Sequence, residues 1–135
     1  MKGNTLLKVL VAATGESIHS RVEEISNNLA IRVISAFDVK DFFKKLREHE
    51  FDLIIFDAEL PSMKATEAFA IARTFYPGTP TVLLHGDENY DLAKAMIDKG
   101  IIYRMLKPVD YDDLELIIDH IQGKKSKVLA SCETY

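Results

Sequence analysis

Two side chains far apart in this sequence of 135 residues could act together chemically. Asp57 directly follows an apolar run at residues 53–56, and Lys107 follows the last apolar run and precedes Pro108. Open α/β sheets gather their functional groups at the carboxyl ends of the strands. A carboxylate and an amine that meet at this edge can form an ion pair. The sequence therefore predicts a site built around Asp57 and Lys107.

Five short runs of β-branched residues or leucine alternate with five stretches whose apolar residues recur at helical spacing. The predicted strands are residues 8–12, 31–35, 52–56, 81–84 and 101–106, and the helical stripes lie within residues 18–29, 39–46, 65–75, 92–97 and 111–121. Asp38 and Asp110 stand where N-caps are expected. Strict alternation with short loops forces parallel strands and right-handed crossovers. The predicted fold is α/β: a flavodoxin-like (βα)5 three-layer sandwich with a five-stranded parallel sheet.

One domain is expected, over residues 7–122, because this length buries a single core without disulfides or metal. The last helix is predicted to end at Gln122 and Gly123. Residues 123–135 are interpreted as a polar C-terminal tail or the start of a linker. They hold the single cysteine, Cys132, so an internal disulfide framework is excluded.

Charge and composition exclude several classes of function. The formal net charge of −4 argues against direct nucleic-acid binding. No apolar stretch approaches the roughly 18–20 residues of a membrane span, and no signal peptide is recognised, so a cytoplasmic protein is expected. The first loop, residues 13–16, has too little glycine for a flavin or nucleotide phosphate loop. Beyond Asp57 there is no nucleophile–base pair, so enzymatic turnover is not expected.

Residues 57–67 and 100–108 resemble two segments of the response-regulator receiver domains of two-component signalling. The first keeps an acceptor aspartate at Asp57, and the second ends in the Lys107-Pro108 pair. The first segment departs from the family at Lys64 and Ala65, where an acid and a glycine are usual. The resemblance implies that Asp57 accepts a phosphoryl group from a histidine kinase or phosphotransfer protein, and that Lys107 neutralises charge on it.

The resemblance also shows what the expected metal site lacks. Receivers bind Mg²⁺ with an acid pair at the end of the first strand, and here Ala13 and Thr14 occupy those positions. Glu16 and Glu59 are the nearby acids that could compensate, and Glu16 is expected to begin the first helix. Because Mg²⁺ needs several oxygen ligands, weak or no binding is predicted, with Asp57 and Glu59 as the remaining ligands.

The positions that couple phosphorylation to the surface in receivers have changed as well. His85 stands where the family has Ser or Thr, and it could support the phosphoryl group as a donor. Arg104 replaces the switch aromatic and follows Tyr103, a pair that resembles one receiver subgroup. The other histidines, His19, His49 and His120, are interpreted as lying on helix surfaces without a role.

Two functional readings remain. In the first, the chain is a receiver that is phosphorylated on Asp57 despite a degenerate metal site. In the alternative, it is a pseudo-receiver that acts by protein contact without phosphorylation. Either would use the surface from Leu92 to Ile121 to contact an output domain or partner protein, and a weak homodimer is expected there.

Overall fold

The computed structural model describes residues 6–98 and 103–134, with side chains in 6–97 and 103–123. One sheet of five parallel strands runs through its centre in the order β2-β1-β3-β4-β5. The strands are β1 (Leu7–Ala12), β2 (Ile31–Ala36), β3 (Leu53–Asp57), β4 (Thr81–His85) and β5 (Tyr103–Leu106). The predicted parallel sheet is therefore confirmed; Ile101 and Ile102, expected in the last strand, lie outside the described residues.

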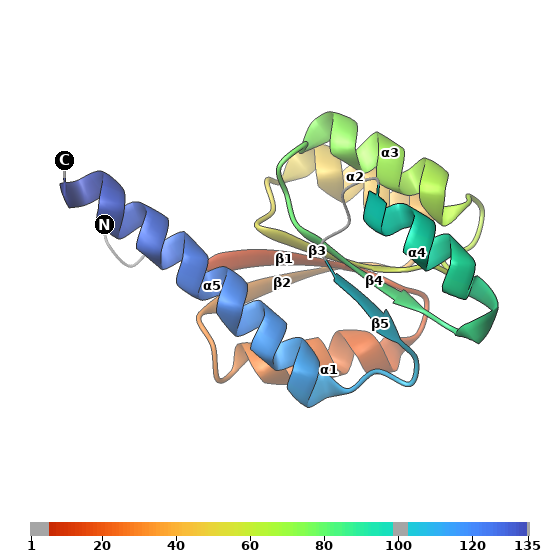
Figure 1. Cartoon of the computed structure of the whole chain (residues 1–135), viewed down its shortest axis with the longest axis horizontal. Coiled ribbons are helices and arrows are strands. Elements are labelled where there is room, and N and C mark those ends of the chain that lie inside the picture. Colours follow the sequence, from red (N-terminus) through yellow and green to blue (C-terminus); the bar gives the residue numbers. More distant parts are fainter. Residues whose placement is uncertain (1–5, 99–102, 135) are drawn as a thin grey trace.

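Helices cover both faces of the sheet, which confirms the three-layer sandwich (Figure 1). They are α1 (Glu16–Ser26), α2 (Val39–Glu48), α3 (Ala65–Phe75), α4 (Tyr90–Asp98) and α5 (Tyr111–Thr134), with a short 3₁₀ turn, η2 (Asp87–Asn89), before α4. Two apolar clusters fill the spaces between the layers, one under α2, α3 and α4 and the other under α1 and α5. The strands alternate between these clusters, as strands buried on both faces must.

Side-chain caps start two of the helices where the sequence predicts them. The Asp38 carboxylate accepts the Asp41 backbone N–H at 2.7 Å, and the Asp110 carboxylate accepts those of Asp112 and Asp113 at 3.0 and 3.2 Å. Each cap satisfies backbone donors that the first helical turn leaves without a partner. These caps confirm that α2 and α5 begin at the predicted positions.

The predicted end of the last helix is wrong. Instead of ending at Gln122 and Gly123, α5 continues to Thr134. A glycine inside a helix costs only about 1 kcal/mol relative to alanine, and the lysine, leucine and alanine residues that follow are good helix formers. Their side chains, including that of Cys132, lie outside the described part.

No helix in the described ranges 6–98 and 103–134 combines the length and apolar character needed to cross a membrane.

Candidate functional site

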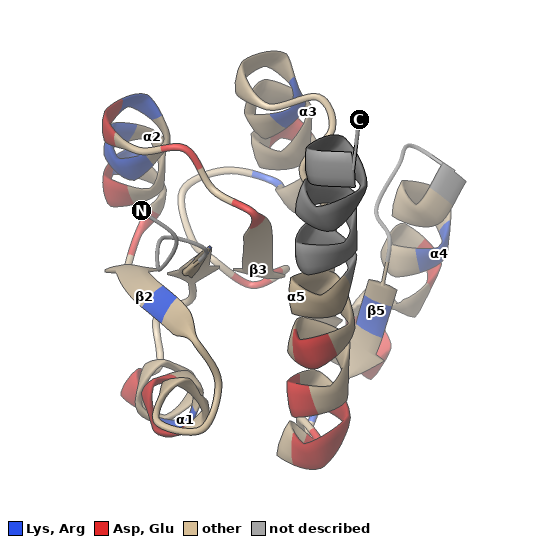
Figure 2. Ribbon diagram, turned by 90° about the vertical axis from the view of Figure 1, so that its left-hand side faces the viewer, with Lys and Arg blue, Asp and Glu red and all other residues tan. Residues whose placement is uncertain are grey.

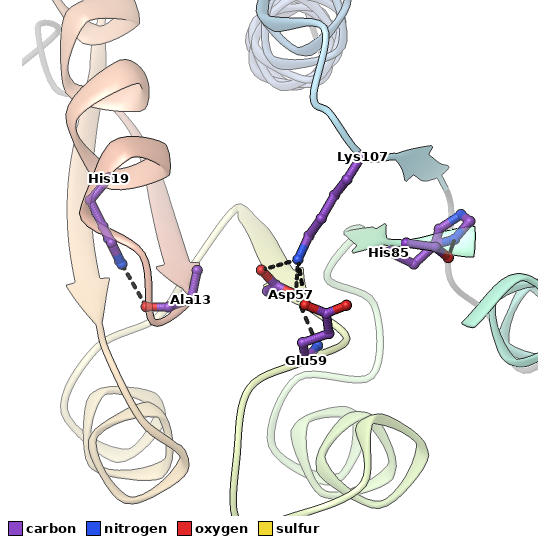
Figure 3. A network of polar contacts seen from close by, with 7 residues as sticks. Ala13, His19, Asp57, Glu59, His85 and Lys107 are labelled. Atoms are coloured by element: carbon purple, nitrogen blue, oxygen red, sulfur yellow. Dashed lines mark hydrogen bonds and ion pairs between the residues drawn. The ribbon is translucent and has the colours of Figure 1, made fainter. Parts of the chain in front are cut away.

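Asp57 and Lys107 meet at the carboxyl edge of the sheet, as the sequence predicts (Figure 3). Lys107 Nζ lies 2.8 Å from both Asp57 carboxylate oxygens, and Oδ1 also accepts the Glu59 backbone N–H at 2.9 Å. The Asp57 side chain is only 13% exposed and that of Lys107 30%. An ion pair this shielded is screened less by solvent and salt than a fully exposed one. The Asp57–Lys107 attraction is therefore stronger than that of an ordinary surface ion pair.

The backbone of the central strands brings these two residues together. The Ala58 N–H donates to the Leu84 carbonyl at 2.8 Å, and the Lys107 N–H donates to the His85 carbonyl at 2.8 Å. The end of β4 thus holds the end of β3 on one side and the residue after β5 on the other. Because all three strands run parallel, their final residues reach the same edge.

Lys107 also contacts a second carboxylate. Its Nζ lies 3.2 Å from Glu59 Oε1, so one amine bridges Asp57 and Glu59. Burial lowers the pKa of Lys107, but hydrogen bonds to the two carboxylates and their negative charge outweigh it and raise the pKa above its ordinary value. Without a phosphoryl group, the site is a closed triad, in which the Lys107 amine pairs with both the Asp57 and the Glu59 carboxylates.

The raised pKa of Lys107 predicts an alkaline loss of stability. Protonated Lys107 is favoured in the folded state, so its contribution is complete below the ordinary lysine pKa of about 10.4 and is lost as pH rises through the folded value. Wild type should therefore be more stable than Lys107→Met at neutral pH, and this difference should shrink above about pH 10.4. Thermal unfolding of both proteins against pH measures it. The exposed Lys94, replaced by Met, is the control, and a difference that stays constant through pH 11 would contradict the assignment.

The residues present do not fit a magnesium site of the usual kind. Across residues 6–97 and 103–123, no three His, Cys, Asp or Glu side chains come together as metal ligands. The two nearby carboxylates, Asp57 and Glu59, are both held by Lys107. Since Mg²⁺ needs octahedral oxygen ligation, a metal would have to compete with the Lys107 amine for the same oxygens.

The two residues that follow β1, Ala13 and Thr14, supply no carboxylate to the site. The Ala13 side chain is fully buried in the cluster under α1 and α5, and Thr14 is exposed. Glu16 begins α1 as predicted and is exposed. The parallel register of β1 and β3, which pairs Ala12 with Phe56, brings the residues that follow each strand close together.

His19 was wrongly predicted to lie on a helix surface; it is 5% exposed. Its Nε2 lies 2.8 Å from the Ala13 carbonyl and its Nδ1 2.8 Å from Ser35 Oγ. Because a carbonyl only accepts, Nε2 carries a hydrogen and donates. His19 thereby anchors the loop after β1, a role that its place beside Ile18, on the edge of the apolar stripe, could have suggested.

His85 and Arg104 lie together, away from the Asp57–Lys107 pair. The His85 ring points away from Asp57 in Figure 3 and is fully buried. Its Nδ1 lies 3.0 Å from the Gly86 carbonyl, while Nε2 has no hydrogen-bond partner among the residues that the structure describes. The Arg104 guanidinium lies over the Tyr90 ring, 4.8 Å from its centre, and His85 faces the same ring at 6.4 Å. The structure thus brings Asp57, Lys107 and Glu59 together and leaves His85 and Arg104 in a separate cluster beneath α4.

Comparison with known proteins shows which family shares this fold and sequence pattern. The sequence model of the response regulator receiver domain matches residues 9–119. Two curated relatives are the transcriptional regulatory proteins ZraR of Klebsiella oxytoca, 29% identical over 64% of this chain, and CrdR of Helicobacter pylori, 26% identical over 80%. The chain spans 20% and 51% of their lengths. A receiver domain from Clostridium thermocellum superposes with a TM-score of 0.80 at 20% identity, covering 91% of this chain and 99% of that one.

Proposed function

Because this chain belongs to the response regulator receiver family, we propose that it receives a phosphoryl group on Asp57. The site would work without a tightly bound metal ion. The observation that supports this is the shielded Asp57–Lys107 pair at the carboxyl edge of the sheet. The donor is a phosphohistidine of a histidine kinase or phosphotransfer protein. His85 holds the Lys107 backbone through its carbonyl, but its side chain has no part in the proposal, because the ring faces Tyr90 instead of the pair.

The proposed transfer uses the chain's own residues. An oxygen of the Asp57 carboxylate attacks phosphorus, the phosphorus–nitrogen bond of the donor breaks, and the histidine leaves with its bonding electrons. Lys107 stays protonated and neutralises negative charge on the transferring group. The Glu59 backbone N–H, already 2.9 Å from Asp57 Oδ1, fixes the orientation of the carboxylate. The product is an acyl phosphate on Asp57.

Glu59 makes this transfer slower. Its carboxylate shares the Lys107 amine and adds negative charge where a phosphoryl dianion must enter. Without the acid pair at Ala13 and Thr14, Mg²⁺ cannot offset that charge efficiently. We therefore expect a low phosphorylated population. The proposal is tested by incubating the protein with acetyl phosphate and Mg²⁺ and measuring intact mass.

Magnesium binding should be weak. Asp57 and Glu59 are the two carboxylates available, and Lys107 competes for both. Titration followed by NMR shifts near Asp57 should show little response up to about millimolar metal, the weak end of protein calcium-type sites. Saturation well below that concentration would show that Glu59 or Glu16 completes a metal site.

The second candidate function is a pseudo-receiver that signals by contact alone. The observation that favours it is the closed triad, in which Lys107 already satisfies Asp57 and Glu59 without a phosphoryl group. The contact surface would run from Leu92 to Ile121, although residues 99–102 within it lie outside the described part. Ile97 and Leu106 are 42% and 48% exposed on it. An output domain, a partner protein or a weak homodimer would bind there with the resting protein already competent.

A further inference from the structure

Two surface hollows lie on helices at opposite faces of the sheet. The first follows α2 and the second lies between α5 and Leu29. The first is lined by Asp38, Lys40, Asp41, Phe43, Lys44 and Arg47, and the second by Leu29, Asp112, Glu115, Leu116 and Asp119. The first hollow thus has three cations beside two aspartates, the second has three acids, and both include apolar residues. The two aspartates already have partners within the chain, because Asp38 caps α2 and Asp41 pairs with Lys45.

Four residues of each hollow, three charged and one apolar, follow the same helical spacing. Lys40, Phe43, Lys44 and Arg47 lie at offsets of 0, 3, 4 and 7 along α2, and Asp112, Glu115, Leu116 and Asp119 lie at the same offsets along α5. Residues at these offsets share one face of a helix. With the helices antiparallel, every cation meets an acid and the two apolar residues meet each other. The pairs are Lys40–Asp119, Phe43–Leu116, Lys44–Glu115 and Arg47–Asp112.

We propose that α2 of one copy of this chain docks antiparallel on α5 of a second copy through these four pairs. The proposal is independent of phosphorylation on Asp57. The partner is a second copy because the chain itself supplies both complementary surfaces. Figure 2 shows basic bands on α2, next to acidic ones, and acidic bands on the first half of α5.

Folding of the single chain does not explain these surfaces. Glu115 and Asp119 are four residues apart, so their like charges destabilise the free helix. Among the side chains that the structure describes, none of the six charged residues forms an ion pair within the chain. Leu116 is 66% exposed, more than any other large hydrophobic residue described. A docked partner would neutralise the acids and cover Leu116.

The contact joins two different surfaces, so it is heterologous and can extend beyond a dimer. α2 packs on one core cluster and α5 on the other, and a copy that offers α2 still has its α5 free. Exposed ion pairs contribute little and are screened by salt. The association is therefore weak, grows with concentration and is reduced when salt rises from about 0.01 to 1 M, as the Debye length falls from about 30 to 3 Å.

Charge swapping tests the pairing. The α2-reversed variant carries Lys40→Glu and Lys44→Glu, and the α5-reversed variant carries Glu115→Lys and Asp119→Lys. In sedimentation velocity up to about 1 mM, where weak association is still visible, each variant alone should lose association about tenfold or more. An equimolar mixture should restore it, because the reversed α2 of one matches the reversed α5 of the other.

Circular dichroism verifies that each variant is folded. Lys64→Glu with Lys94→Glu is the matched control for the α2-reversed variant, because it makes the same change in net charge. This control should associate as wild type does. A wild type that stays monomeric at about 1 mM, or a mixture that fails to recover, overturns the proposal. An equal loss in the control also overturns it, since the association would then depend on net charge or on α4.

Discussion

Replacement of Asp57 by Asn should abolish covalent phosphorylation. With acetyl phosphate and Mg²⁺, wild type should gain the mass of one phosphoryl group slowly and in only part of the molecules, whereas Asp57→Asn should gain none. The reason is that the amide lacks the anionic oxygen needed to attack phosphorus. Asn is close to Asp in shape and can still accept the Lys107 and Glu59 donors, so the fold should survive the change.

Two companion variants identify the cause of that loss. Asp91→Asn removes an exposed aspartate from α4 and should phosphorylate as wild type does. Lys107→Met keeps the nucleophile but removes the cation, so transfer should fall by about tenfold or more, in the range of other electrostatic contributions to phosphoryl transfer. A wild type that gains no mass, with its unfolding temperature and NMR spectrum unchanged by acetyl phosphate, would favour the contact-only reading. Rapid, complete phosphorylation that converts monomer to dimer only in wild type would restore an ordinary phospho-switch.

The fold was predictable because it follows from local patterns that agree with one another. Apolar runs of strand length, such as residues 53–56, alternate with amphipathic stretches, and Asp38 and Asp110 mark two helix starts. Parallel strands then place Asp57 and Lys107 at one edge whatever the details of packing. The pair is 50 residues apart in sequence, yet topology alone predicts their contact.

The parts that were missed depend on side-chain geometry. His19 is polar, but its two ring nitrogens find Ala13 and Ser35, which makes its burial inexpensive. The bridge from Lys107 to Glu59 depends on the rotamer of an exposed side chain. The continuation of α5 past Gly123 depends on a small free-energy balance that the sequence pattern does not show. Neither the Lys107–Glu59 bridge nor the continuation of α5 has a period or a motif to reveal it.

His85 illustrates a different limit. Its position at the end of β4 suggested a donor to the phosphoryl group, but the strand alternation turns its ring to the α4 side. There it faces Tyr90, which Arg104 covers. The role of His85 at Asp57 stays a prediction that the geometry does not support with any contact.

An acid pair introduced at residues 13 and 14 should make the stability of this protein depend on magnesium. The double variant Ala13→Asp, Thr14→Asp places a carboxylate at a fully buried position and gathers three or more acids near Asp57. Burial and mutual repulsion should lower the free energy of unfolding by about 2–4 kcal/mol in metal-free buffer. A divalent cation relieves that repulsion. With metal about twentyfold above its dissociation constant, binding should return about 2 kcal/mol, or several degrees in the unfolding temperature.

Wild type should show almost no shift under the same conditions, because Ala13 and Thr14 offer no carboxylate and Lys107 holds the remaining acids. The matched control is Ala13→Asn with Thr14→Asn, which reproduces the size and polarity of the new side chains without their charge. It should be destabilised by the buried amide and remain insensitive to magnesium. Thermal unfolding of the three proteins with and without Mg²⁺ distinguishes the outcomes.

A wild type stabilised as strongly as the acid variant would show that Glu59 or Glu16 already completes the site. An acid variant whose unfolding temperature does not change with Mg²⁺ would show that residues 13 and 14 do not face Asp57. The end of β1 would then differ from the receiver pattern in its backbone as well as in its side chains.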